Sequence, residues 1–205
     1  MNNKIFGLGC LGVIVVGIIV IGAWLMSSYN TLVTKQEKAK TEWSNIDVIL
    51  KRNQQELNSL VKILRSAKKM NQEAVENMVA ARAKATQTVI DPTNCTPEQM
   101  AAWSAAQGEL ERAMGRLMVI HEADYPELKG NEHFTKAMDQ LEGSVNRLGE
   151  VRRKYNLAVE DYMKQSRTFP TVVIASLFGF GPMYRYEAPA NTEEETTDFS
   201  ELDED

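Results

Sequence analysis

A chain of 205 residues is long enough for one folded domain with an anchor and a tail, but not for several large domains. Its formal net charge of −5 and the lack of a base-reading motif argue against a nucleic-acid partner. Its two cysteines, Cys10 and Cys95, fall in an apolar run and in a predicted loop, which excludes a disulfide framework.

The first element is an apolar run from Ile5 to Met26 that contains neither a charged residue nor a proline. As a helix it would be about 33 Å long at about 1.5 Å per residue, which matches a hydrocarbon core of about 30 Å. A cleaved secretory signal is the alternative, but its apolar region would be shorter. Trp24 and Tyr29 are typical of a membrane interface. We therefore expect a transmembrane helix over residues 5–26, in contact with membrane lipid.

Positive charge is concentrated after this helix. Only Lys4 precedes it within residues 1–4, whereas several basic residues follow closely: Lys35, Lys38, Lys40, Lys51 and Arg52. Basic residues near a span remain on the cytoplasmic side. The pattern predicts a single-pass protein whose N-terminus is outside and whose C-terminal domain is cytoplasmic.

A heptad pattern typical of a coiled coil runs through residues 43–88 and predicts one long, unbroken helix. Stepping alternately by three and four residues gives a seam that is almost entirely apolar. Its members are Trp43, Ile46, Leu50, Asn53, Leu57, Leu60, Leu64, Ala67, Asn71, Ala74, Met78, Ala81 and Ala85.

Two further helices are expected, from Thr96 to about Asp124 and from Glu132 to Arg167. Thr96 before Pro97 is a typical helix start, and Pro126 disfavours helix at the residue before it. The second seam comprises Trp103, Gln107, Leu110, Met114, Leu117 and His121, and the third comprises Phe134, Met138, Leu141, Val145, Leu148, Arg152, Tyr155, Val159 and Tyr162.

No long stretch alternates with period two, so the predicted fold class is all-α. Because the loops are short, neighbouring helices should be antiparallel. Residues 27–168 are therefore expected to form an elongated up-and-down bundle of three long helices, with room for a short fourth.

Beyond the bundle, residues 169–186 are apolar and residues 187–205 are acidic. Phe169-Pro170 ends the third helix, and the run that follows is too short to span a bilayer. Its candidate interaction residues are Phe169, Leu177, Phe178 and Phe180. They could cover their own bundle, lie in the membrane interface, or contact a second copy, which would make a homo-oligomer. The tail has nine acidic and no basic residues and is expected to be disordered.

Charged candidates are few. Asp47 and Arg52 are expected to form a surface ion pair or a pair that fixes helix register, and Arg152 could meet Asp47 or Glu142 at the seam. The two histidines, His121 and His133, lack a metal-ligand spacing, and nothing marks Cys95 as activated. We therefore expect no metal, no cofactor and no catalysis.

The chain resembles the LemA family of bacterial membrane proteins. The pieces that carry the resemblance are Tyr29-Asn30-Thr31-Leu32-Val33, Trp43-Ser44-Asn45-Ile46-Asp47-Val48, Glu122-Ala123-Asp124-Tyr125-Pro126-Glu127-Leu128-Lys129, Asn131-Glu132-His133-Phe134, Arg152-Arg153-Lys154-Tyr155-Asn156 and Leu177-Phe178-Gly179-Phe180. The resemblance implies an anchored helical bundle of the bacterial inner membrane, without known catalysis. One departure is that Glu56-Leu57-Asn58 stands where the family usually has an Ile-Pro pair. A missing proline favours the unbroken first helix.

Two functions are compatible with these features. The first is a self-associating structural or scaffolding protein of the cell envelope. The second is an adaptor or sensor in envelope-stress signalling that binds another protein, whose identity the sequence does not indicate.

Overall fold

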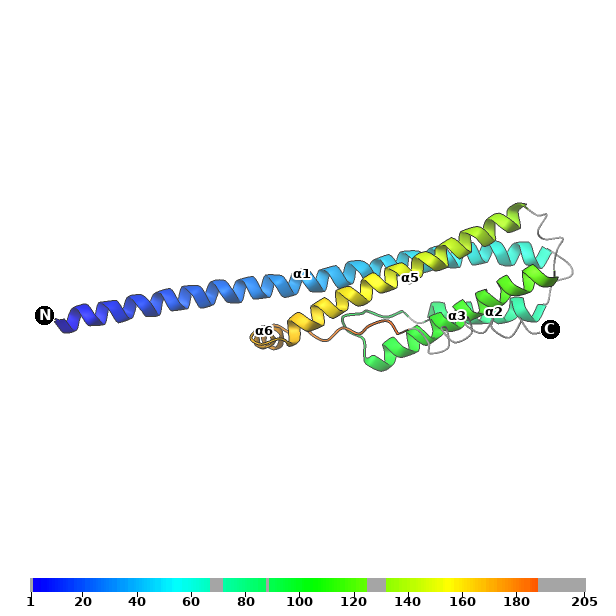
Figure 1. The fold of residues 1–205 in the computed structure, drawn as a ribbon. Helices are drawn as coiled ribbons and strands as arrows, with labels where there is room; N and C mark the ends of the chain where they lie inside the picture. Colours follow the sequence, from blue (N-terminus) through cyan, green and yellow to red (C-terminus); the bar gives the residue numbers. More distant parts are fainter. Residues whose placement is uncertain (1, 67–71, 88, 125–131, 188–205) are drawn as a thin grey trace, which may run out of the picture.

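The computed structural model describes residues 2–66, 72–87, 89–124 and 132–187 (Figure 1). Every regular element within these ranges is a helix: α1 (Asn2–Ser66), α2 (Gln72–Gln87), α3 (Pro97–Asp124), α5 (Glu132–Arg167) and α6 (Thr171–Leu177). The long helices alternate in direction, and α5 runs back along α1 (Figure 1). The all-α, antiparallel bundle is therefore confirmed. The acidic tail, apart from Glu187, lies outside the described residues.

The apolar anchor and the first helix of the bundle are one helix. α1 has 65 residues and no glycine or proline after Gly22, so nothing in its sequence interrupts the backbone hydrogen bonds there. Its apolar part stands clear of the bundle, with large side chains exposed from Val13 to Ile21. Of the described part of the chain, α1 is the helix that is long and apolar enough to cross a membrane.

The expectation of an unbroken helix over 43–88 is wrong. α1 ends at Ser66, and α2 begins at Gln72 and packs beside α3. Seam residues on both helices are nevertheless buried, as Leu64 and Met78 show. These two are separated by two whole heptads, so the reversal of the chain does not shift the apolar phase. Periodicity identifies the buried face of each helix, but it does not report that the chain has turned between them.

The other predicted helix ends are confirmed. Thr96 and Gln99 form a reciprocal cap: the backbone N–H of Gln99 donates to Thr96 Oγ1 at 3.2 Å, and the N–H of Thr96 donates to Gln99 Oε1 at 2.9 Å. This arrangement satisfies two N–H groups at the start of α3. α3 ends at Asp124, and α5 spans Glu132–Arg167.

The bundle has two apolar cores. The proximal core, nearer the anchor, is made by Leu32, Ala39, Ile46, Met100, Trp103, Leu148, Tyr155, Ala158, Val159, Tyr162, Ile174, Ala175, Met183 and Tyr186. The distal core is made by Leu57, Leu60, Val61, Leu64, Val75, Met78, Ala85, Leu110, Met114, Phe134, Ala137 and Leu141. Between them, the buried Ser144 hydroxyl donates to Asn53 Oδ1 and joins α5 to α1.

Candidate functional site

The most elaborate part of the molecule is the place where the chain returns after α6. Gly179 has φ 74°, a left-handed conformation that glycine adopts without strain, and the Phe180 N–H bonds to the Ala175 carbonyl at 2.9 Å. This cap ends α6 and turns the chain back along α5. We name residues 178–187 the return segment; it begins with the turn at Phe178 and Gly179 and then has no regular secondary structure.

Side chains of α5 hold the return segment through its backbone. Tyr162 Oη donates to the Gly181 carbonyl at 2.7 Å, and Tyr155 Oη donates to the Tyr184 carbonyl at 2.9 Å. The Asn156 amide bonds both backbone groups of Tyr186, at 2.8 and 2.9 Å. These bonds replace the backbone partners that an extended segment would have in a sheet.

The return segment completes an aromatic junction between three helices. Trp43 of α1, Trp103 of α3, Tyr155 of α5 and Tyr186 form a chain of rings whose neighbouring centroids are 4.7–5.6 Å apart. Such tilted and edge-on pairs contribute beyond the burial of their area. The junction therefore fixes α1, α3 and α5 relative to one another.

Arg152 lies at the edge of this junction and has a different partner from either that we expected. Its Nη2 is 2.5 Å from Glu111 Oε1 on α3, and its guanidinium lies 4.1 Å above the Tyr186 ring. Both side chains are largely buried, at 11 % and 18 % exposure. The proposed pairings of Arg152 with Asp47 or Glu142 are therefore wrong.

Asp47 and Arg52 each pair within α1 instead of with one another. Asp47 bonds Lys51 at 2.6 Å, and Arg52 bonds Glu56 at 2.8 Å, both across one helical turn. Asp47 and Lys51 are exposed, because they lie off the face of α1 that Ile46 buries. Pairs of this kind stabilise a helix only slightly and do not fix the register between helices.

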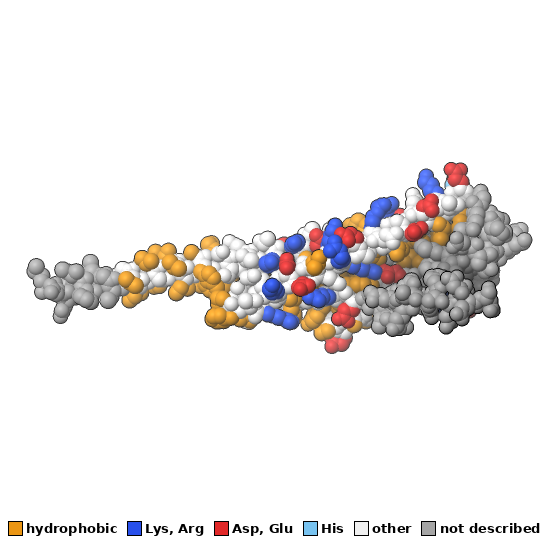
Figure 2. Space-filling model, in the orientation of Figure 1, with side chains coloured by type: hydrophobic (Ala, Val, Ile, Leu, Met, Phe, Trp, Pro, Cys, Tyr) orange, Lys and Arg blue, Asp and Glu red, His pale blue; other side chains and the backbone are white. Residues whose placement is uncertain are grey.

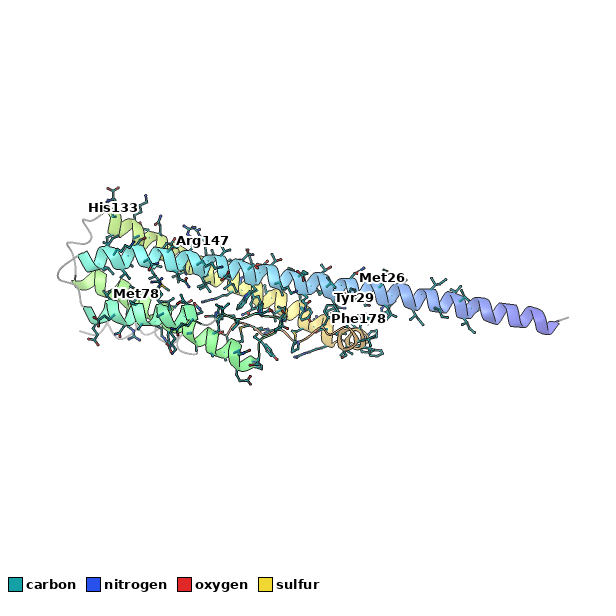
Figure 3. The ribbon with its side chains drawn as sticks, turned by 180° about the vertical axis from the view of Figure 1, so that it is seen from behind. Met26, Tyr29, Met78, His133, Arg147 and Phe178 are labelled. Carbon is teal, nitrogen blue, oxygen red and sulfur yellow. The ribbon has the colours of Figure 1, made fainter. Side chains whose placement is uncertain are left out.

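The candidate interaction residues divide into two groups. The rings of Phe178 and Phe180 contact Tyr29 of α1 edge-on, with centroids 5.0 and 5.5 Å apart. Figure 3 shows Phe178 and Tyr29 together just beyond Met26. Phe169 and Leu177 remain 79 % and 76 % exposed, and Phe178, although it contacts Tyr29, is still 58 % exposed. The segment thus covers its own bundle with one face, which is one of the three alternatives that the sequence leaves open, and another face stays exposed.

The titratable groups of the junction are held in their neutral or paired forms. Burial raises the pKa of Tyr155 well above its ordinary range and raises the pKa of Tyr186 to about 12. Burial also raises the pKa of the Cys95 thiol, which opposes formation of a reactive thiolate. Among the described residues, no three His, Cys, Asp or Glu side chains are placed to share a metal ion.

The raised pKa of Tyr186 predicts a loss of stability in alkali. In the unfolded chain the Tyr186 phenol ionises near pH 10, whereas in the folded chain its pKa is about 12. The contribution of the neutral phenol to the free energy of unfolding is therefore complete below pH 10 and is lost as the pH rises through 12. Because Tyr186 Oη is buried without a protein hydrogen bond among the described residues, Tyr186→Phe should change stability little at pH 7. At pH 11.5 it should retain about 1–2 kcal/mol more than the wild type.

Denaturant titration of both proteins at pH 8 and pH 11.5 measures this difference. Equal losses in the two proteins would mean that the Tyr186 hydroxyl is not buried at the junction.

The sequence did not indicate Glu111, Asn156 or Tyr186 as important residues. Glu111 directly follows Leu110 of the second seam, and Arg152 is the charged member of the third seam. An acidic residue beside one seam and a basic residue in another were the available signal for their pairing. Asn156 occurs in one of the pieces that resemble the LemA family, but neither it nor Tyr186 could be assigned a partner, since a bond between a helix side chain and a distant backbone has no period.

Comparison with known proteins places these features in a family. The magnetosome proteins MamQ 2 and MamQ 1 of Paramagnetospirillum magneticum (strain AMB-1) are each 26 % identical to this chain over 199 residues, covering 86 % of it and 71 % of their own length. MamQ of Magnetospirillum gryphiswaldense is 25 % identical over 203 residues, covering 88 % and 72 %. The LemA family model matches residues 42–199, from the start of the first seam to the tail. With its exposed apolar helix the protein is membrane-associated, and the chain belongs to the LemA family.

Proposed function

We propose that this protein is a structural, non-catalytic scaffold of the bacterial inner membrane, whose helical bundle stands on the membrane as a rigid post. The observation that carries the proposal is the continuity of α1 from the apolar anchor into both cores of the bundle (Figure 1). From Ser27 to Ser66 this helix extends about 60 Å at about 1.5 Å per residue. A continuous helix holds any molecule bound at its far end at a fixed distance and direction from the membrane.

The polar contacts inside the bundle support a structural role. Asn53–Ser144 and Arg152–Glu111 each join two different helices within a largely apolar surrounding. Buried polar pairs of this kind can fix how helices align, because sliding one helix would leave the partners unpaired. Such a bundle is suited to keeping a single arrangement of its helices.

Self-association of anchored copies is part of the proposal. Confinement to one membrane raises the effective concentration of the bundles, so weak lateral contacts become sufficient. Cross-linking in native membranes, followed by sizing of the detergent-solubilised particles, tests it: a large, uniform assembly of this chain is expected. A matched variant carrying an unrelated transmembrane helix in place of residues 5–26 should still assemble if the bundle makes the contact. A monomer in native membranes would contradict the scaffold.

We further propose that the bundle is cytoplasmic and the N-terminus outside. Beyond the apolar anchor and a short uncharged stretch, basic side chains appear on the bundle (Figure 2), beginning with Lys35, which is the pattern of a cytoplasmic flank. Cys95 is a poor reporter because its thiol is partly buried with a raised pKa. In a variant without Cys10 and Cys95, Val89→Cys is a better one, because Val89 is 90 % exposed.

A membrane-impermeant maleimide should leave position 89 unlabelled in intact spheroplasts and label it after lysis. The matched control, Asn2→Cys, should be labelled in both. Labelling of position 89 in intact spheroplasts would reverse the orientation.

An adaptor or sensor is the second candidate, and one surface feature favours it. A groove of about 920 Å³ lies between the start of α3, the end of α5 and the return segment. Its lining mixes charged and sulfur-containing side chains, among them Glu98, Met163, Arg167, Met183 and Arg185. Such flexible, mixed linings suit a peptide partner. If cross-linking in native membranes joins a monomer of this chain to a different protein through these residues, the adaptor replaces the scaffold.

A further inference from the structure

We propose that α6 is a second membrane contact: its exposed face, made by Phe169, Val173, Leu177 and Phe178, lies in the lipid headgroup region of the leaflet from which α1 emerges. The inference rests on α1 crossing a bilayer and is independent of the scaffold role. We name these four side chains the α6 face.

The position of α6 along α1 is the first argument. α6 and the residues after it dock on α1 at Tyr29, which Phe178 and Phe180 contact. Tyr29 is three residues beyond Met26, the end of the apolar run, so the contact is about 4.5 Å from that end at about 1.5 Å per residue. Trp24 and Tyr29 are both partly exposed at this level, as expected of aromatic side chains at an interface.

The direction of α6 is the second argument. In Figure 1 and in the opposite view of Figure 3, α1 is seen lengthwise whereas α6 is seen almost end-on. α6 therefore crosses the axis of α1. When α1 spans a bilayer, a helix that crosses it at this level lies along the membrane plane, as interfacial helices do.

The third argument is that α6 is apolar on both faces. Its inner face, with Ile174 and Ala175 at 2 % and 4 % exposure, packs in the proximal core. On the outer side of α6, Val173 and Leu177 are one turn apart and are 58 % and 76 % exposed, and Phe169, which precedes the helix, is 79 % exposed. No charged residue occurs between Arg167 and Arg185. A concentrated apolar face beside a membrane anchor is expected to enter the same apolar phase.

Charge just beyond the end of the anchor also fits a lipid surface. Lys35 and Lys38 line a shallow groove of about 740 Å³ that continues upward from Ala23 and Met26 of the anchor. Lys164 and Arg167 are in the last turn of α5, beside α6. Asp161 is the acidic side chain in this groove, and it is 3.9 Å from Lys35. An apolar base below a mainly basic rim complements acyl chains below anionic headgroups.

A spin label at Leu177 tests the proposal in the full-length protein. Cys10 and Cys95 are replaced by serine, Leu177→Cys is labelled, and the protein is placed in nanodiscs of phosphatidylcholine and phosphatidylglycerol. Collisions with oxygen, which concentrates in lipid, and with a water-soluble nickel complex are then measured. The matched control is Val48→Cys, which is 62 % exposed on the same bundle but farther from the anchor.

At Leu177 the nickel collision rate should be several-fold lower than at Val48, and the oxygen collision rate higher. Val173→Cys should give the same result, which protects the test against a local disturbance at one site. Equal nickel collision rates at positions 177 and 48 would overturn the proposal. Protection from both reagents, with spin–spin broadening that disappears on dilution with unlabelled protein, would also overturn it, because the face would then be a contact between copies.

Discussion

Replacing Arg152 by alanine should lower the free energy of unfolding by about 3 kcal/mol. The substitution leaves Glu111, which is 18 % exposed, without its charged partner inside the bundle, and removal of one member of a buried pair costs about 3–5 kcal/mol. The lower end applies because Glu111 retains some contact with water. The loss also includes the contact of the guanidinium with the Tyr186 ring.

A double-mutant cycle separates the ion pair from the rest of this effect. Arg152→Ala, Glu111→Ala and the double variant are unfolded by denaturant in detergent micelles, and the double variant should be less destabilised than the sum of the single ones. Arg153→Ala is the control, because its pair with Glu150 is at the surface and should contribute less than about 1 kcal/mol. Equal effects at positions 152 and 153 would mean that Arg152 is not buried against α3.

Leu60→Ala should destabilise the distal core by about 2–5 kcal/mol. Leu60 is fully buried between helices in a cluster with Leu57 and Leu64. Truncation removes methyl groups from that contact and leaves a cavity that the long, regular helices close only in part. The matched control is Leu157→Ala on α5, because Leu157 is 51 % exposed and should cost less than about 1 kcal/mol.

Thermal unfolding followed by helical circular dichroism, in the same micelles, measures both leucine variants. A loss of only a few tenths at Leu60, or a loss equal to that at Leu157, would contradict the packing of α1 against α5.

Most of the fold could be predicted from the period of the apolar residues. Phe134, Leu141, Leu148 and Tyr155 of the third seam are all buried, because a helix of 3.6 residues per turn brings such positions to one face. Proline and the Thr96 cap located the ends of α3. The reversal between α1 and α2 was missed, because the seams on either side keep the same heptad phase and neither glycine nor proline occurs from Arg65 to Gln72.

Much less of the candidate site could be predicted. The apolar run after Phe169 was recognisable as a contact segment, but its direction along α5 depends on bonds from Tyr155, Asn156 and Tyr162 to a distant backbone. Any residue type can accept a hydrogen bond through its backbone carbonyl, so the sequence does not indicate which residues accept these bonds. The partner of Arg152 was missed for a related reason: Glu111 is on a different helix, α3, and the period of one helix does not identify the residue that faces it on another.

The rigid connection between anchor and bundle is tested most directly by one distance. Spin labels at Ala23→Cys and Val48→Cys, in a variant without Cys10 and Cys95, are on the same face of α1 on either side of the membrane boundary, and both sites are exposed. In nanodiscs, a continuous helix predicts a narrow distribution centred near about 38 Å, for 25 residues at about 1.5 Å each. A second pair, Val48→Cys with Leu157→Cys, reports that the bundle is intact. A broad or much shorter distribution for the first pair, with an unchanged second pair, would place a hinge between anchor and bundle and contradict the rigid post.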